Sequence, residues 1–306
     1  MTMLVYAVKH INEIVRSNSR SGGIFTALSD LVLDADGVVY GCVLDEALKA
    51  IHVRTENKDM RDKMRGSKYV QSSLGDTFIN VKKDLDEKKK VLFSGTSCQV
   101  AGLKSFLGKT YDNLLCVDIV CHGVPSPLVW EKYKEWQGNV RSVDFRNKNK
   151  YGWRAHVETL TTSHGVIDSR VWTTIFYGHN VLRPSCYECP FKSIHHPGDI
   201  TIADYWAIEK AAPEFDDNKG VSLVLVNTDN GVKWFEKAKD TVIWKQTNIE
   251  DSMQPPLIAP FPKPEDREKF WKDIHEKRFS YIAKKYGGQV PLWKKIARRV
   301  KRIIIK

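Results

Sequence analysis

Two short apolar runs, each ending in a cysteine loop, most constrain the fold of this 306-residue chain. Residues 91–95 and 114–120 are apolar enough for buried strands, and each leads into a Gly-, Pro-, Ser- or Thr-rich turn containing Cys98 or Cys121. A helix is expected after the first turn, over 100–107. Repeated strand–loop–helix units predict a parallel sheet whose ligand loops gather at the carboxyl ends of its strands.

The remaining pattern separates the chain into two halves. Helices are expected over 22–33 and 75–88, and a strand over 38–44. After about residue 137, polar and apolar residues alternate, as is typical of antiparallel strands. Strands are expected there over 143–146, 155–160, 166–174, 200–206 and 221–226. The predicted fold class is α/β: a mostly parallel α/β domain over 1–137 and an α+β domain over 138–285 that closes over the site.

The net charge of +11 is concentrated in a predicted basic amphipathic tail over 286–306. The stretch 293–306 carries seven Lys or Arg residues and no acid, and its apolar residues share one helical face. This pattern fits either peripheral contact with an anionic membrane or a frayed basic end. Nucleic acid is not an expected partner, because no basic strand with interleaved aromatic residues occurs. No run approaches the ~20 apolar residues of a membrane span, and no signal peptide is evident, so a cytoplasmic protein is expected, in contact with the inner membrane face if the tail binds lipid.

Six cysteines raise the question of disulfides, metal ligation or core packing. In a reducing compartment, clustered cysteines are more often ligands than bridges. Cys42 and Cys116 lie in apolar runs and are expected to be core thiols. The other four form a complete thiolate set, which suits an iron–sulfur cluster or, as an alternative, a structural zinc ion. They are Cys98, Cys121, Cys186 and Cys189.

Two glycine-containing loops are candidate cradles for a phosphate or a flavin. One precedes a helix, so that its free N–H groups and an arginine could meet an anion. Each loop taken alone could also be an ordinary turn. The candidate ligand-binding residues are Ser19, Arg20, Ser21, Gly22 and Gly23 in the first loop and Gly66, Ser67, Lys68 and Tyr69 in the second.

These segments, taken in order, resemble the beta subunit of coenzyme F420-reducing hydrogenase and its relatives. The most specific elements are Gly95-Thr96-Ser97-Cys98-Gln99 and Cys121-His122-Gly123-Val124-Pro125, followed by Cys186-Tyr187-Glu188-Cys189 and Ala203-Asp204-Tyr205-Trp206. The resemblance runs from about residue 17 to about residue 285. It implies a [4Fe-4S] cluster held by the four cysteines. It also implies a bound FAD, contacted by the two glycine-containing loops and by a third loop with Gly95, Thr96, Ser97 and Gln99. Ser97 stands where the family often has proline.

The resemblance implies an oxidoreductase that passes electrons between an iron–sulfur donor and a hydride partner or substrate at the flavin. His122 would donate a hydrogen bond to a cluster sulfide or to the flavin. Alternatively, it would be a loop histidine whose hydrogen bonds are made within the protein. Asp204 would orient a substrate or cap a turn. We expect Gly22→Val to lose flavin first, because a side chain would block the close approach of the loop.

The partners and substrate are also expectations drawn from the resemblance. Many bacterial relatives carry an N-terminal ferredoxin module that this sequence lacks, so a separate ferredoxin or electron-donor subunit is expected. The tail favours surface-polysaccharide biosynthesis, with a small-molecule or lipid-linked sugar substrate. One alternative is reduction of coenzyme F420 as a hydrogenase or dehydrogenase beta subunit. The other is a non-enzymatic scaffold that bears zinc or a cluster.

Overall fold

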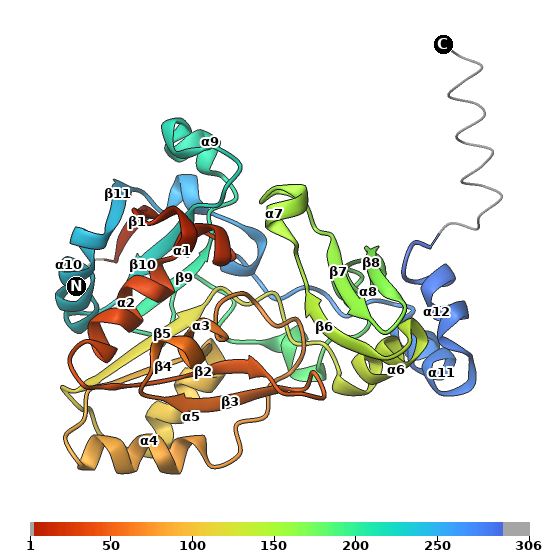
Figure 1. The fold of residues 1–306 in the computed structure, drawn as a ribbon, viewed down its shortest axis with the longest axis horizontal. Coiled ribbons are helices and arrows are strands. Elements are labelled where there is room, and N and C mark those ends of the chain that lie inside the picture. The colour runs from red at the N-terminus through yellow and green to blue at the C-terminus, as the bar shows by residue number, and fades with distance from the viewer. Residues whose placement is uncertain (1–2, 290–306) are drawn as a thin grey trace.

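The computed structural model describes residues 3–289, and its centre is an eight-stranded sheet in the order β11-β1-β10-β9-β5-β4-β2-β3 (Figure 1). The strands are β1 Leu4–His10, β2 Val38–Leu44, β3 Ala50–Thr55, β4 Val91–Thr96, β5 Leu114–Ile119, β9 Ile200–Asp204, β10 Ser222–Val226 and β11 Val242–Thr247. The four middle strands, from β9 to β2, are parallel, whereas β3 and the β10-β1-β11 edge are antiparallel to their neighbours. The predicted α/β fold class is confirmed.

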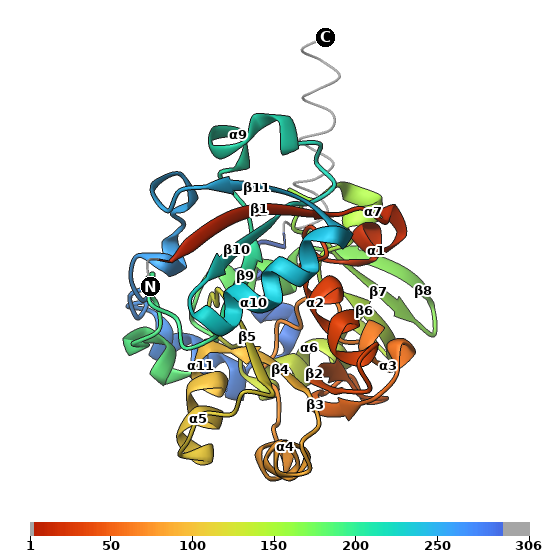
Figure 2. The same ribbon diagram turned by 90° about the vertical axis from the view of Figure 1, so that its left-hand side faces the viewer.

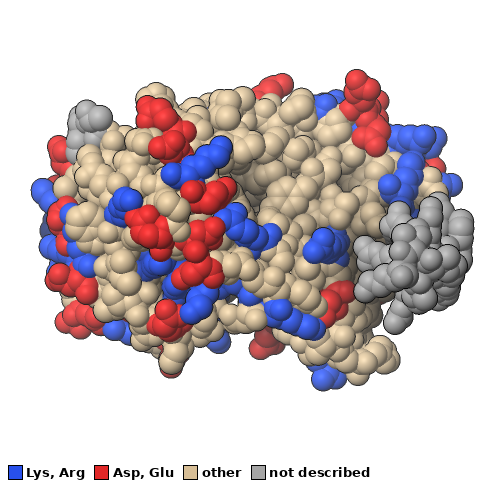
Figure 3. Space-filling view, turned by 90° about the horizontal axis from the view of Figure 1, so that it is seen from above, with Lys and Arg blue, Asp and Glu red and all other residues tan. Residues whose placement is uncertain are grey.

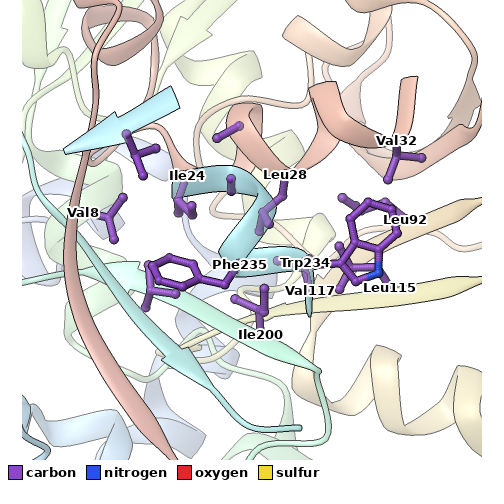
Figure 4. Close-up of a cluster of buried hydrophobic side chains, with 14 of the residues drawn as sticks. Val8, Ile24, Leu28, Val32, Leu92, Leu115, Val117, Ile200, Trp234 and Phe235 are labelled. Atoms are coloured by element: carbon purple, nitrogen blue, oxygen red, sulfur yellow. The ribbon is translucent and has the colours of Figure 1, made fainter. Parts of the chain in front are cut away.

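Helices cover both faces of this sheet. One face carries α2 (Ile24–Leu33) and α10 (Asp229–Ala238), and Figure 4 shows their Leu28 and Phe235 among the buried side chains of the sheet. The other carries α4 (Thr77–Asp86) and α5 (Ser97–Leu107), with Phe93 and Leu103 in the core. Burial of each such side chain contributes about 1.5–3 kcal/mol. Because both faces are covered, β4 and β5 are nearly continuous apolar runs.

A second, smaller layer lies beside the main sheet (Figure 1). Its three antiparallel strands are β6 Val140–Asp144, β7 Glu158–Thr162 and β8 Gly165–Ser169. The helices α6 Pro127–Gln137, α8 Val171–Tyr177, α11 Arg267–Glu276 and α12 Phe279–Lys285 share an aromatic-rich core with it. Trp130, Trp172 and Phe270 are almost fully buried there.

Short helices lie in the connections between these elements, and Figure 2 shows α1 and α3 beside α2. The short α-helices are α1 Glu13–Asn18, α3 Lys58–Asp62, α7 Lys148–Tyr151 and α9 Ile208–Ala211. The 3₁₀ turns are η1 Pro184–Glu188, η2 Pro213–Phe215, η3 Lys239–Thr241, η4 Glu250–Ser252 and η5 Pro255–Leu257.

The strand predicted over 166–174 is wrong in its second part. It ends at Ser169, and α8 begins at Val171, whose N–H donates to Ser169 Oγ at 3.0 Å. The β-branched run favours a strand locally, but Trp172, Ile175 and Phe176 have helical spacing and pack into one core. Tertiary packing therefore overrides local propensity.

The main sheet crosses the predicted domain boundary at residue 137, because β9, β10 and β11 come from the second half of the chain. Of the predicted tail over 286–306, residues 290–306 lie outside the described residues. Within 3–289 no helix is long and apolar enough to cross a membrane. On the face in Figure 3, acidic and basic side chains are interspersed on the left and sparse at the centre.

Candidate cofactor-binding site

A cavity of about 1150 Å³ lies at the carboxyl ends of the parallel strands. The ends of β2, β4, β5 and β9 contribute Cys42, Thr96, Ile119 and Asp204 to its lining, and residues of the smaller layer close the opposite side. The carboxyl edge of a parallel sheet is where α/β proteins bind ligands. The volume exceeds the ~300–1000 Å³ of most small-ligand pockets, so a ligand as large as a dinucleotide fits.

One side of the cavity, here called the basic wall, consists of the 19–23 and 65–69 segments with Arg20, Arg65 and Lys68. Arg20 Nη2 donates to Asp144 Oδ1 at 2.7 Å, while its buried Nε has no partner. Arg65 Nε donates to Thr26 Oγ1 at 2.9 Å. Burial lowers the pKa of Lys68 to about 8, so the ammonium stays mostly charged at neutral pH. The wall is therefore suited to an anion.

The start of α2 strengthens this wall. Gly23 precedes the helix with φ +98°, and no side chain caps the first turn. A non-glycine residue is strained at such a φ. Uncapped N–H groups at a helix N-terminus, together with the positive end of its dipole, form an anion-binding site.

Gly22 and Ser97 do not line the cavity, although the sequence predicted that both contact the cofactor. A Cβ on Gly22 would lie 2.0 Å from Val8 O and 2.7 Å from Ser222 N. Gly22 is therefore needed for packing against β1 and β10. Ser97 is buried, and its Oγ lies 3.1 Å from His196 Nδ1.

Asp204 lies on the cavity with both carboxylate oxygens engaged. Arg146 Nη1 donates to Oδ2 at 2.5 Å, and Trp153 Nε1 donates to Oδ1 at 2.8 Å, where Ser21 Oγ also donates. Burial opposes ionisation, but the Arg146 guanidinium holds the pKa of Asp204 below its usual value. Asp204 therefore ties the first cofactor loop to the smaller layer.

The opposite side, here called the aromatic wall, consists of His122, His156, Tyr177, His179, Trp206 and Phe261. His122 Nε2 lies 2.9 Å from His179 Nε2, so one of these atoms must be an unprotonated acceptor. Tyr177 OH lies 3.1 Å from His156 Nδ1. The Phe261 ring lies 4.2 Å from the His122 ring, and Tyr177 is 38% exposed. This wall offers ring faces and proton-carrying groups.

Two of the four candidate ligand cysteines line this cavity, and the other two lie near them. Cys98 and Cys121 line it, at the start of α5 and just after β5. Burial raises the pKa of Cys121 to about 12, and the nearby thiolates of Cys186 and Cys98 raise it further. Burial also raises the pKa of Cys186, and the nearby Cys189 raises it further. Segments far apart in the sequence therefore bring the four sulfurs into one neighbourhood.

The donor set fits an iron–sulfur cluster. Within residues 3–289, no three side chains of His, Cys, Asp or Glu lie close enough together to hold a single metal ion. In a four-iron cluster each thiolate binds a different iron, so the ligand sulfurs lie farther apart than around one zinc. Lys192 is buried beside Cys121, Cys186 and Cys189, and its Nζ donates to His122 O at 2.8 Å. A buried ammonium fits a site that carries net negative charge.

The two remaining cysteines differ in their surroundings. Cys116 is fully buried, as predicted for a core thiol. Cys42 packs against the aromatic-rich core but also lines the cavity, so the prediction of a core thiol holds only in part. Cys42 lies near the carboxyl end of β2, where the neighbouring strand in the sheet is β3.

Sequence reasoning missed several cavity residues: His52, Arg146, His156, Tyr177, His179 and Phe261. They come from segments without a glycine-rich turn or a cysteine. The one available signal was a concentration of His, Tyr and Phe between residues 151 and 180, where three histidines and two tyrosines accompany Phe176.

Comparisons with known proteins show the family and the fold of this chain. Residues 88–252 match the sequence model of a family described as the C terminus of the coenzyme F420 hydrogenase/dehydrogenase beta subunit. A chain of the F420-reducing [NiFe] hydrogenase complex from Methanosarcina barkeri, solved as a xenon derivative, is similar with a TM-score of 0.53. The match has 18% sequence identity and covers 95% of this chain and 94% of that chain. A search of curated proteins gave no match.

The family match places this protein among the oxidoreductases. The chain belongs to the coenzyme F420 hydrogenase/dehydrogenase beta subunit family.

Proposed function

We propose that the protein is an FAD- and [4Fe-4S]-dependent oxidoreductase. The observation that carries the proposal is that four cysteines from three separate segments lie near one another, two of them lining a cavity that also has a cationic wall. The cavity is large enough for a dinucleotide, and the cysteines supply the thiolates that clusters use. Bound together, flavin and cluster would convert two-electron hydride chemistry into one-electron steps.

The basic wall is the proposed cofactor cradle. The start of α2 would bind the pyrophosphate of FAD, with Arg20 and Arg65 neutralising its charge. Ser19, Ser21, Gly23, Gly66, Ser67, Tyr69, Gly95, Thr96 and Gln99 would contact the rest of the cofactor.

The proposed ligands of the cluster are Cys98, Cys121, Cys186 and Cys189. Lys192 would offset part of the cluster's negative charge from the protein side. Cys98 is exposed, so electrons could enter there from a separate ferredoxin or donor subunit. That the matching chain of the hydrogenase is part of a complex supports a separate partner.

His122 and Asp204 take different proposed roles. Burial lowers the pKa of His122 to about 3, so its ring is neutral and hydrogen-bonded to His179. It would face the reacting ring as part of the aromatic wall. Asp204 has no free oxygen for a substrate, so we assign it as a positioning residue that holds Arg146 and Ser21.

The substrate of the aromatic wall is proposed to be a small molecule or lipid-linked sugar of bacterial surface-polysaccharide biosynthesis. Aromatic faces suit a sugar ring as well as a flat heterocycle. Reduction of coenzyme F420 is an equally supported candidate, because the family description and the matching hydrogenase both name it. Adding coenzyme F420 to the dithionite-reduced protein separates the two: loss of its visible absorbance supports F420, and no change favours another acceptor.

The experiment that tests the cofactors is metal, sulfide and flavin analysis of protein purified without oxygen. The expected result is one FAD and about four irons per chain. Cys98→Ser and Cys186→Ser should lose iron and keep flavin, whereas Cys116→Ala, in the core, should keep both. Zinc without flavin would overturn the proposal in favour of the scaffold alternative.

Membrane contact is a separate proposal that depends on residues 293–306. Fractionation of the full chain and of a variant ending at residue 292 tests it. We expect the full chain to pellet with membranes containing anionic lipid and the shortened chain to stay in the supernatant. Equal distribution of the two would contradict it.

A further inference from the structure

One end of the cavity holds three side chains that the proposed function has not used. They are Cys42 on β2, His52 on β3 and Lys68 in the segment before residue 70. Cys42 and His52 are directly opposite each other in the antiparallel register, so their side chains share one face of the sheet. Burial is the main cause of the lowered pKa of His52 and of the raised pKa of Cys42. The Lys68 charge lowers both pKa values, so it adds to the shift of His52 and opposes that of Cys42.

His52 presents a buried acceptor that lacks a donor. Its Nε2 lies 3.1 Å from Ser94 O, and a carbonyl can only accept, so Nε2 carries the proton and Nδ1 is a bare lone pair. Nδ1 is buried and has no partner among the described residues. The residue is fixed, because its N–H donates to Ser73 O at 2.9 Å and its ring stacks on Phe93. Such an orphan acceptor costs free energy unless a ligand N–H or O–H reaches it.

Lys68 presents the complementary group. Its Nζ donates to Lys63 O at 2.8 Å and to Arg65 O at 2.9 Å. An ammonium has three donors, so one is left for a further acceptor. Among residues 3–289, no carboxylate lies within 4.0 Å of Nζ to neutralise it. The two side chains therefore offer an acceptor and a cationic donor to the same end of the cavity.

We propose that His52 and Lys68 form a subsite for the pyrimidine edge of the flavin ring. His52 Nδ1 would accept from the ring N–H, and Lys68 would donate to a neighbouring ring carbonyl. The inference rests on the proposed flavin function. The adenine edge of FAD also places a donor beside an acceptor, so the position of the subsite decides between them.

The position favours the redox ring. His52 contacts Ser94 in β4, three residues before Ser97. Strand β4 leads directly into α5, which carries Cys98 in its first turn. Ser72, beside the subsite, accepts from Gln99 Nε2 at 2.9 Å and so ties it to that turn. Electron transfer between a flavin ring and a cluster requires the ring to lie near the cysteines. The start of α2, the proposed phosphate site, also belongs to the basic wall but comes from an earlier segment of the chain.

Lys68 then has a predictable effect on the flavin potential. When the ring gains a hydride it gains two electrons and one proton, and the hydride donor loses the same, so the ring acquires one negative charge. A cation beside the pyrimidine carbonyl stabilises this charged reduced form relative to the neutral oxidised form. Lys68 is thus assigned to raise the midpoint potential of the flavin.

The test compares Lys68→Met, Lys68→Arg and His52→Leu with a matched control, Lys63→Met, whose side chain is exposed. Each flavin-stripped protein is titrated with FAD, with FMN for the ring half and with ADP for the nucleotide half. The midpoint potential is measured for each reconstituted protein. We expect Lys68→Met to weaken FAD and FMN binding by roughly ten- to a hundredfold, leave ADP binding unchanged and lower the potential. His52→Leu should weaken FMN binding, and Lys68→Arg should restore the potential.

Each other outcome has a defined meaning. Weakened ADP binding with unchanged FMN binding places adenine at the subsite and overturns the proposal. Unchanged FMN affinity and potential in Lys68→Met also overturn it. If wild-type protein binds none of the three ligands, the proposed flavin function itself fails. Since Lys68 is partly exposed, its variants should fold even if His52→Leu does not.

Discussion

The basic wall and the aromatic wall of the cavity are built by different means. The basic wall comes from segments before residue 70, and its cations are held by backbone carbonyls, a hydroxyl and two exposed carboxylates. The aromatic wall comes from residues after 120, contacts itself ring to ring and includes the 38%-exposed Tyr177. A fixed charged cradle suits a resident cofactor, whereas a more open aromatic surface suits a ligand that exchanges. The difference between the walls thus supports the proposed division between FAD and substrate.

The largest expected effect separates packing from binding on the basic wall. Gly22→Val should destabilise the protein by at least about 4 kcal/mol, because its side chain meets the β1 backbone at Val8 O. Gly66→Ala has room, with Arg20 Nη2 at 3.8 Å, and should cost only about 1 kcal/mol for its positive φ. Urea unfolding measures both. Loss of flavin from a fully stable Gly22→Val protein would restore the role predicted from the sequence.

The next effect concerns the residue that joins the walls. Asp204→Asn should lose about 3 kcal/mol of stability, because Arg146 stays buried without its counter-charge. Glu214→Gln, which breaks the exposed pair with Lys245, should lose less than about 1 kcal/mol. Chemical denaturation of both variants provides the comparison. Unchanged stability with abolished turnover would instead make Asp204 a catalytic residue.

Asp204 also predicts a pH dependence. Its folded pKa is lowered, so its ion pair contributes stability fully above the unfolded value of about 3.9 and loses it as pH falls through the folded value. Wild-type stability should therefore decline in acid more steeply than that of Asp204→Asn. Parallel curves below about pH 4 would contradict the assigned ion pair.

A smaller effect tests the cationic cradle directly. Arg20→Met should weaken FAD binding roughly ten- to a hundredfold, as expected for loss of a charge-assisted contact. Its stability should change by less than about 1 kcal/mol, because the Asp144 partner is 45% exposed. Fluorescence titration with FAD measures the affinity, and Arg141→Met, on the exposed part of β6, is the control.

The smallest effect is expected on the aromatic wall. Tyr177→Phe keeps the ring and removes only the hydroxyl near His156 Nδ1, a contact worth about 1 kcal/mol. FAD affinity should stay within about twofold of wild type, while the rate of hydride exchange with an added acceptor should fall. If Tyr177→Phe weakened FAD as much as Arg20→Met, the two walls would not have separate ligands.

The sequence predicted the parts of the fold that local pattern controls. The strand expected over 38–44 is β2 itself, and those expected from residues 91 and 114 begin where β4 and β5 begin. The local pattern also predicted the positions of Cys98 and Cys121 after these strands, because strand ends and glycine-rich turns are local features. Periodicity failed at α8, where the same β-branched residues suit a strand or a helix until a core selects one.

The composition of the cavity was less predictable, because it depends on contacts between distant segments. Ser21 meets Asp204, and Lys148 Nζ donates to Arg16 O at 2.6 Å, across more than a hundred residues in each case. No spacing in the sequence reports such contacts. The orphan acceptor of His52 is invisible for the same reason, since it depends on which of its neighbours can donate.

The sequence by itself determined the α/β class, the strand-end loops and the thiolates available to a cluster, because these follow from periodicity, turn chemistry and residue type. Only the tertiary structure decided that Gly22 supports the sheet, that Cys42 faces the cavity and that Asp204 is satisfied by Arg146, Trp153 and Ser21. The physical reason is that steric exclusion, burial and hydrogen-bond satisfaction are properties of neighbours in space, which the main sheet brings together from both halves of the chain.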